Sequence, residues 1–213
     1  MKKQVMCYGD SNTWGYSPHT KERYPSLVRW VGVLAGALGA EYDVIAEGLN
    51  GRTTVWDDPL EGGPSKNGAR YLPPCLESHM PLDLAVVMLG TNDLKHRFSL
   101  TGFDIAQGAG VLIDIIRGSC AGRHGAPPRV LLVAPAPLVE LSEFRHIFEG
   151  GLRKSEQFSE QYRRVAEEKG CPLLDASEHV TSSAMDGVHW DPDGHKAFGL
   201  AVASRVRELL PTV

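Results

Sequence analysis

The sequence predicts an α/β fold in which helices wrap a parallel sheet. Short apolar runs alternate along the chain with stretches of helical periodicity, as expected for βαβ units. The run at residues 84–89 is continuously apolar, which is typical of a central parallel strand buried on both faces. With 213 residues, 42% of them hydrophobic, the chain fits one domain, which we place at residues 1–213.

Five strands are predicted from the apolar runs. They cover residues 4–8, 42–46, 84–89, 130–134 and 173–174. The first three end in polar, glycine-containing turns at Ser11, Gly51 and Asn92. Because ligands bind outside the carboxyl ends of the strands in an open parallel sheet, we expect these three residues to gather at one edge.

Helices are predicted where apolar side chains recur every three or four residues. They cover residues 27–38, which Gly39 terminates, then 105–116, 152–168 and 192–210. Residues 52–74 contain repeated Pro and paired Gly with little periodicity, so we expect a long surface loop. A second irregular stretch is expected from residue 135 to about residue 151.

Composition and charge exclude several classes of protein. The net charge is -4 and no run of Lys and Arg occurs, so no nucleic-acid partner is expected. No apolar stretch approaches the roughly 20 residues of a membrane span, and the apolar residues 5–8 are too few for a signal peptide. We therefore expect a cytoplasmic protein without a membrane partner.

The four cysteines, Cys7, Cys75, Cys120 and Cys171, form no Cys-x-x-Cys pair. This spacing argues against a structural zinc site and favours reduced, mostly buried thiols. A catalytic cysteine is a weaker alternative, since no histidine motif accompanies any of the four.

Ser11 lies in a tight Gly-Asp-Ser turn at the end of the first strand, which exposes its hydroxyl and nearby N–H groups. Taken alone, the Gly-Asp-Ser turn favours an ordinary turn serine or a helix N-cap over a nucleophile. The G-x-S-x-G elbow of α/β-hydrolases is absent. Ser11 becomes a candidate nucleophile only if a base removes its proton.

Asp186 precedes His189 by three residues, across a predicted turn. A carboxylate there can accept the Nδ1–H bond and leave Nε2 free as a base, although an exposed loop histidine would give the same pattern. The neighbouring Asp193 and His195 suggest a calcium loop only faintly, because Leu200 stands where the last ligand should be. We place both in the first turn of the last helix.

Two further turns offer donors for an oxyanion. Asn92 has an amide N–H₂, and the N–H of Gly51 can approach a ligand closely because glycine has no side chain. Each could instead be an ordinary turn residue.

Four short segments of the sequence, taken together, resemble the conserved blocks of the SGNH (GDSL) hydrolase superfamily. They are Gly9-Asp10-Ser11-Asn12-Thr13, Gly51, Gly90-Thr91-Asn92-Asp93 and Asp186-x-x-His189. Further segments resemble its bacterial arylesterase/acyltransferase branch, which includes acetylesterases. These are Arg29-Trp30, Glu47-Gly48-Leu49, Arg52-Thr53-Thr54, Asp57-Asp58-Pro59, Tyr71-Leu72-Pro73 and Phe148-Glu149-Gly150-Gly151. Asn12 departs from the leucine usual after the serine, and a polar residue there would change the polarity of the pocket.

The resemblance implies a three-layer α/β/α, flavodoxin-like fold with a five-stranded parallel sheet. It implies catalysis by Ser11, Asp186 and His189, with an oxyanion hole formed by Ser11, Gly51 and Asn92. Esters of short acyl groups with aryl, alkyl or sugar alcohols are the implied small-molecule substrates, with acyl transfer to alcohols as a second activity. A thioesterase or a sugar-specific deacetylase on this scaffold remains an alternative, as does, more remotely, a non-catalytic binding protein. We expect no cofactor and no catalytic metal.

A homo-oligomer is also expected. The irregular loops carry the apolar residues Val55, Trp56, Leu60, Leu138, Leu141, Phe144, Ile147 and Phe148. Loops this apolar usually cover something, either another subunit or the pocket of their own chain. The resemblance favours assembly into an octamer.

Overall fold

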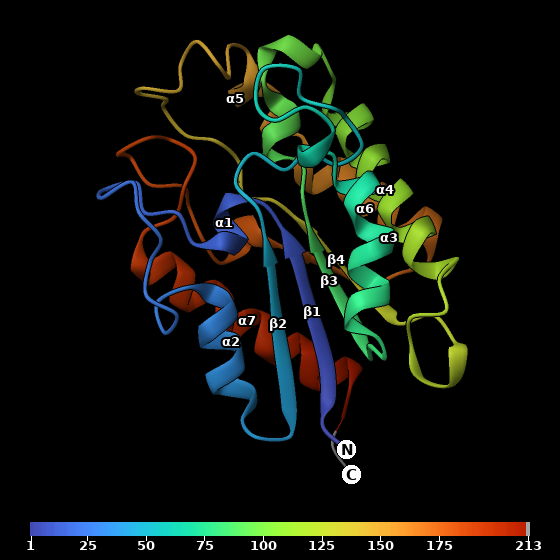
Figure 1. The fold of residues 1–213 in the computed structure, drawn as a ribbon. Helices are drawn as coiled ribbons and strands as arrows, with labels where there is room; N and C mark the ends of the chain where they lie inside the picture. Colours follow the sequence, from blue (N-terminus) through green and yellow to red (C-terminus); the bar gives the residue numbers. More distant parts are fainter. Residues whose placement is uncertain (212–213) are drawn as a thin grey trace.

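A five-stranded parallel sheet forms the centre of the protein in the computed structural model, which describes residues 1–211 (Figure 1). The strands are β1 (Lys3–Gly9), β2 (Tyr42–Gly48), β3 (Leu84–Met88), β4 (Arg129–Ala134) and β5 (Leu173–Asp175). Their order is β2-β1-β3-β4-β5, and every neighbouring pair is parallel. This is the flavodoxin-like order, and all five predicted strands are confirmed.

Helices cover both faces of the sheet, which confirms the three-layer architecture (Figure 1). The helices α2 (Trp30–Leu38) and α7 (Pro192–Leu209) pack on one face, and α3 (Gly68–His79), α4 (Gly102–Arg117) and α6 (Phe158–Lys169) pack on the other. Alternate residues of a strand point to opposite faces, so Val5 and Cys7 pack with α2 and α7, and Met6 and Tyr8 pack with α3 and α4.

The prediction of a loop over residues 52–74 is wrong in its last part. Helix α3 begins at Gly68, where the Asn67 side chain caps it by accepting the N–H of Arg70, and it continues through Pro73 and Pro74. Leu72, Cys75 and Leu76 are buried on its inner side. Burial of this apolar face outweighs the local cost of the two prolines, which sequence periodicity alone did not reveal.

Two predicted helices also differ from the structure. Helix α2 begins at Trp30 rather than at residue 27, because a turn at Pro25 precedes it, and Leu27 is 81% exposed. The helix predicted at 152–168 is two helices, α5 (Gly151–Ser155) and α6. The Ser155 hydroxyl donates to the Leu152 carbonyl and accepts the N–H of Leu138, which fastens the end of α5 to the neighbouring loop.

Cys7 and Cys75 are buried as expected, Cys171 is half-buried and Cys120 is exposed, so the expectation of mostly buried thiols holds for only part of the set. None of the described helices is both long enough and apolar enough to cross a membrane.

Candidate active site

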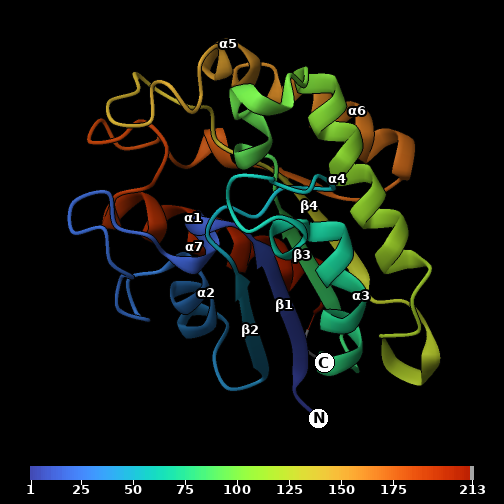
Figure 2. The same ribbon diagram turned by 45° about the horizontal axis from the view of Figure 1, so that its top comes forward.

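The predicted site residues gather at the carboxyl edge of the sheet, which Figure 2 turns toward the reader. Ser11 follows β1, Gly51 lies three residues after β2, and Asn92 follows β3. Ser11, Gly51, Asn92 and His189 all line one pocket. The strand order reverses between β1 and β3, where crevices form in open parallel sheets.

Ser11 is the first residue of the short helix α1 (Ser11–Trp14), and Asp10 caps that helix by accepting the N–H of Asn12 at 3.0 Å. A side chain at Gly9 is excluded, because its Cβ would lie 2.1 Å from the Thr13 hydroxyl and 2.9 Å from the Met88 carbonyl. The glycine therefore lets the chain turn sharply from strand to helix with the serine at the turn.

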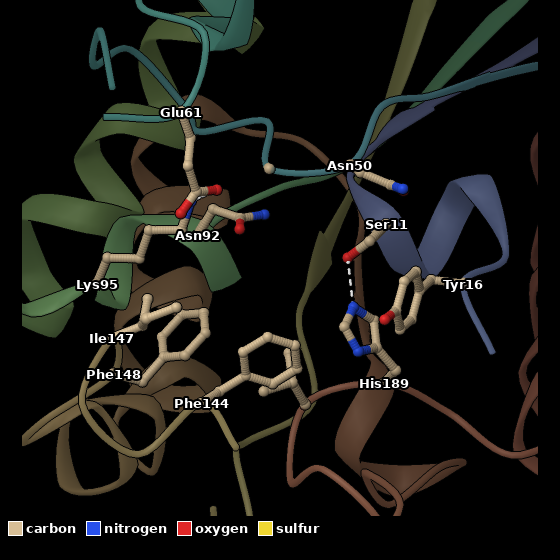
Figure 3. Close-up of a pocket in the computed structure, with 12 residues that line it drawn as sticks. Ser11, Tyr16, Asn50, Glu61, Asn92, Lys95, Phe144, Ile147, Phe148 and His189 are labelled. Atoms are coloured by element: carbon tan, nitrogen blue, oxygen red, sulfur yellow. Dashed lines mark hydrogen bonds and ion pairs between the residues drawn. The ribbon is translucent and has the colours of Figure 1, made fainter. Parts of the chain in front are cut away.

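Ser11, His189 and Asp186 form a hydrogen-bonded relay. The Nε2 atom of His189 lies 2.9 Å from Ser11 Oγ (dashed line in Figure 3), and its Nδ1 lies 2.6 Å from Asp186 Oδ2. The other oxygen of Asp186 accepts the N–H groups of Val188 and His189, each at 2.9 Å. Burial alone would raise the pKa of Asp186, but the hydrogen bonds and charge of His189 outweigh it and hold that pKa below its usual value. Asp186 is therefore a fixed carboxylate that orients the imidazole.

Three potential hydrogen-bond donors belong to residues that line the same pocket. Among the turns and loops of residues 1–211, the N–H groups of Ser11 and Gly51 donate to no backbone carbonyl. Gly51 has a φ of 79°, which favours glycine. The Asn92 amide gives one N–H to the Arg52 carbonyl at 3.1 Å, which fixes its rotamer and leaves the second N–H for a ligand.

Two buried carboxylates support these donors. Asp93 accepts the N–H of Thr54 at 3.0 Å and also the Thr54 hydroxyl, which ties the segment after Gly51 to the turn that carries Asn92. Burial raises the pKa of Asp93 to about 6, against the lowering effect of the Thr54 hydrogen bonds. Burial likewise raises the pKa of Asp10 to about 6. Both groups hold backbone in place at a cost in desolvation.

The pocket has a volume of about 220 Å³ and two unlike walls (Figure 3). Phe144, Ile147, Phe148 and Val188 form an apolar wall. Phe148 is 4% exposed, and Phe144 and Ile147 pack against the core cluster, so this part of loop 135–150 folds back over its own chain. Trp56 and Leu60 of the other loop remain exposed.

The opposite wall is polar and held by ion pairs. Lys95 Nζ lies 2.7 Å from Glu61 and 3.0 Å from Asp58, and Arg97 pairs with the same two carboxylates. Burial would raise the pKa of Asp58, but the hydrogen bonds and charges of Lys95 and Arg97 hold it below its usual value. Figure 3 shows Glu61, Asn92 and Lys95 across the cavity from Ser11 and His189.

Several residues of the site escaped the sequence analysis. Tyr16 lies with its ring 4.2 Å from that of His189, and Asn50, Glu61 and Lys95 line the pocket. They lie in irregular segments with no periodicity, and only the closeness of Tyr16 to the Gly-Asp-Ser turn could have drawn attention to it.

Asn12 does not line the pocket. Its amide donates to the Val188 carbonyl at 3.3 Å, so it joins the serine turn to the histidine loop. The expected change in pocket polarity at this position is therefore wrong.

His195 lies apart from the relay, in the first turn of α7 as predicted. It is fully buried, and its Nδ1 accepts the N–H of Trp30, the first residue of α2, at 3.3 Å. Burial lowers its pKa to about 4, with a further lowering from His189. His195 therefore acts as a neutral cap for α2.

The fold and the site together define a serine hydrolase with a flavodoxin-like sheet, which has a serine, a histidine and an aspartate at the carboxyl edge of that sheet. Residues 7–197 match the model of the GDSL-like lipase/acylhydrolase family, so the chain belongs to this family and is an ester hydrolase.

Solved structures that are similar to this chain agree with its assignment to a family of ester hydrolases. An aryl esterase of M. smegmatis is 42% identical over 98% of this chain and 100% of its own, with a TM-score of 0.93. Est24, a carbohydrate acetylesterase from Sinorhizobium meliloti, is 40% identical over 98% of this chain and 100% of its own, with a TM-score of 0.92. Among curated proteins, none matches the chain.

Proposed function

We propose that this protein hydrolyses short-chain, acetyl-type carboxylic esters of aryl, alkyl or sugar alcohols through an acyl-enzyme on Ser11. The observation that carries the proposal is the Ser11–His189–Asp186 relay, which opens into a cavity of about 220 Å³ lined by oxyanion donors. The aryl esterase and carbohydrate acetylesterase names of the similar structures support this choice of substrates.

In the proposed mechanism, His189 Nε2 takes the Ser11 proton as Oγ bonds to the carbonyl carbon. The N–H groups of Ser11 and Gly51 and the Asn92 amide donate to the oxyanion, where preorganised donors stabilise the developing charge. His189 then gives its proton to the leaving alkoxide, and the acyl-enzyme remains. Water attacks it with His189 again as base, which releases the acid and restores Ser11.

The size of the cavity supports a short acyl group. Pockets for drug-sized ligands have volumes of about 300–1,000 Å³. The cavity here is smaller, at about 220 Å³, and Phe144 and Phe148 narrow it. An acetyl group fits such a space, whereas a long acyl chain would have to displace these rings.

The polar wall supports a substrate whose alcohol part carries further hydroxyl groups, such as an acetylated sugar. Glu61 can accept hydrogen bonds and Lys95 can donate them, and both are already held in place by ion pairs. Glu61→Gln should lower kcat/KM for an acetylated sugar by about tenfold and change that for an aryl acetate by less than about twofold. Equal losses on both substrates would argue against this role.

Acyl transfer is part of the proposal. If the proposed assembly restricts the pocket, water would be scarce beside the acyl-enzyme, and an added alcohol should then compete with water for the acyl group. Product analysis of an acetate ester with and without a primary alcohol measures this competition directly. Hydrolysis alone, at any alcohol concentration, would remove transfer from the proposed function.

A fluorophosphonate probe tests the central assignment, because it labels only an activated serine. We expect one adduct, located on Ser11 by peptide mass spectrometry, and none in Ser11→Ala. No labelling of the folded wild-type protein would favour a non-catalytic binding protein. A panel of acetyl sugars, aryl acetates and acyl-CoA then separates the esterase from the thioesterase and the sugar-specific deacetylase.

A further inference from the structure

Three side chains that commonly bind metals meet on the face of the sheet covered by α3, outside the pocket. Cys75 and His79 are four residues apart on α3, so they project from the same side of the helix. Glu47 of β2 is opposite Tyr8 in the sheet register, which directs it to the same face as that buried ring. One potential ligand atom from each lies within 4.8 Å of the other two.

The imidazole of His79 and the carboxylate of Glu47 are already close to the spacing of two zinc ligands. A tetrahedral zinc site with bonds of about 2.0–2.3 Å separates its ligand atoms by about 3.3–3.7 Å. His79 Nε2 and Glu47 Oε1 are 2.7 Å apart and would have to separate by less than about 1 Å. Cys75 is 1% exposed, and the side chains of His79 and Glu47 are 28% and 19% exposed, so the cluster is sheltered but not sealed.

We propose that Glu47, Cys75 and His79 form a binding site for a single Zn²⁺ ion. Three protein ligands leave the fourth tetrahedral position to water, the open arrangement known from catalytic zinc sites rather than the closed one of structural sites. His79 borders one hollow on the surface and Glu47 borders another, so two of the three ligands are next to solvent. A search for paired cysteines misses this site because it has only one thiol, and its ligands come from two elements.

The donor set selects the class of metal. A thiolate and an imidazole favour zinc and other soft or borderline ions over Mg²⁺ or Ca²⁺, which prefer oxygen. The Met6 thioether lies 3.7 Å from Cys75 Sγ and adds to this soft environment. Burial raises the pKa of the Cys75 thiol to about 12, so its proton must pass to solvent as the zinc–sulfur bond forms.

One nearby cation opposes binding. The Arg52 guanidinium lies 4.1 Å from the centre of the Tyr8 ring and donates to the Gly9 carbonyl at 2.9 Å. Its charge partly offsets that of Glu47, so we expect reversible binding rather than an ion retained through purification.

Such an ion would tie α3 to the end of β2, just before the turn to Gly51. None of its three ligands lines the active-site pocket, so the ion would stabilise the fold and take no part in the proposed ester chemistry.

Cobalt(II) is the probe, since it substitutes for zinc and gives a thiolate-to-cobalt charge-transfer band only when a cysteine is a ligand. Tag-free protein, stripped with a chelator, is titrated with cobalt(II), and zinc(II) is then added in competition. The wild type should show the band at one cobalt per chain and lose it to zinc. Cys75→Ser should lack the band, and the control Cys120→Ser, at an exposed cysteine, should keep it.

His79→Gln is the second variant, because its half-buried position makes folding more secure than at Cys75. It should weaken zinc affinity by at least about tenfold. Zinc should raise the thermal midpoint of the wild type and of Cys120→Ser, and it should raise that of His79→Gln much less. Absence of the band in the folded wild type would overturn the proposal. The same holds if Cys75→Ser keeps the band, or if zinc stabilises wild type and His79→Gln equally.

Discussion

Replacing His195 with asparagine tests whether this histidine is buried in its neutral form. The imidazole lies against Trp190 and Tyr24, and its Nδ1 accepts the N–H of Trp30, so protonation would remove the acceptor and bury a charge. An asparagine amide oxygen can take the place of Nδ1 but does not titrate. Circular dichroism should therefore show that the variant folds.

The size of the pH-dependent change in stability follows from the lowered pKa of His195. The value falls from 6.5 to about 4, a difference of about 2.5 units, equivalent to about 3 kcal/mol at about 1.4 kcal/mol per unit. Between these two values the unfolded chain binds the proton and the folded chain does not. Stability from this residue is therefore complete above about pH 6.5 and is lost as the pH falls toward about 4.

Urea denaturation from about pH 7.5 to about pH 4 measures this effect for the wild type and for His195→Asn. Over this range the unfolding free energy of the wild type should fall by about 3 kcal/mol relative to that of His195→Asn. Taking the difference cancels the titration of groups that the two proteins share. If the two curves run parallel throughout, His195 is not buried as the neutral form, and its role as a cap for α2 fails with it.

Four further outcomes are expected. His189→Asn should lower kcat for an acetate ester by about three or more powers of ten, whereas His195→Asn should keep most of the activity; the reverse would transfer the role of base to His195. Excess EDTA should leave ester hydrolysis unchanged, and a loss restored by zinc or calcium would place a metal in the reaction. Leu72→Ala should destabilise the protein by about 2–5 kcal/mol in urea, because this side chain is fully buried on α3. Light scattering should detect a homo-oligomer, up to an octamer, with the exposed Trp56 and Leu60 at contacts; full activity of a monomer at high dilution would refute the assembly.

The strands were predictable because each is a short, mainly apolar segment, and most of them end at a recognisable turn. The sheet order then places Ser11, Gly51 and Asn92 at one edge, as expected from parallel strands. Helix α3 was missed because Pro73 and Pro74 oppose it locally, and the packing of Leu72 and Leu76 against the core, which favours it, cannot be read from the sequence.

The catalytic relay could be predicted from the sequence, whereas the walls of the pocket could not. Asp186 and His189 are three residues apart in one turn, so their pairing is local and could be inferred from sequence. Glu61 and Lys95 meet through a long loop whose course depends on the buried Asp58. No pattern in the sequence predicts the path of this loop. The residues proposed to select the alcohol part of the ester could therefore be identified only from the structure.

Replacing the buried carboxylate of Asp93 should change stability and activity in opposite directions. Its pKa is raised from 3.8 to about 6, so the folded chain binds the proton more readily than the unfolded chain between these values. Stability from this group is present at low pH and is lost as the pH rises toward about 6, with a cost near neutral pH of up to about 3 kcal/mol.

Asp93→Asn removes this charge, so it should raise the unfolding free energy near neutral pH and change it less near about pH 4. The same substitution loses the carboxylate that accepts both the N–H and the hydroxyl of Thr54, and the segment after Gly51 should then be held less firmly. We therefore expect kcat to fall with little change in KM, because the Gly51 donor acts on the oxyanion rather than on the bound ester. Urea denaturation and steady-state kinetics on the same sample separate the two effects. A variant that is more stable and fully active would show that Asp93 has no positioning role. One that is less stable near neutral pH would show that its hydrogen bonds outweigh the cost of burying its charge.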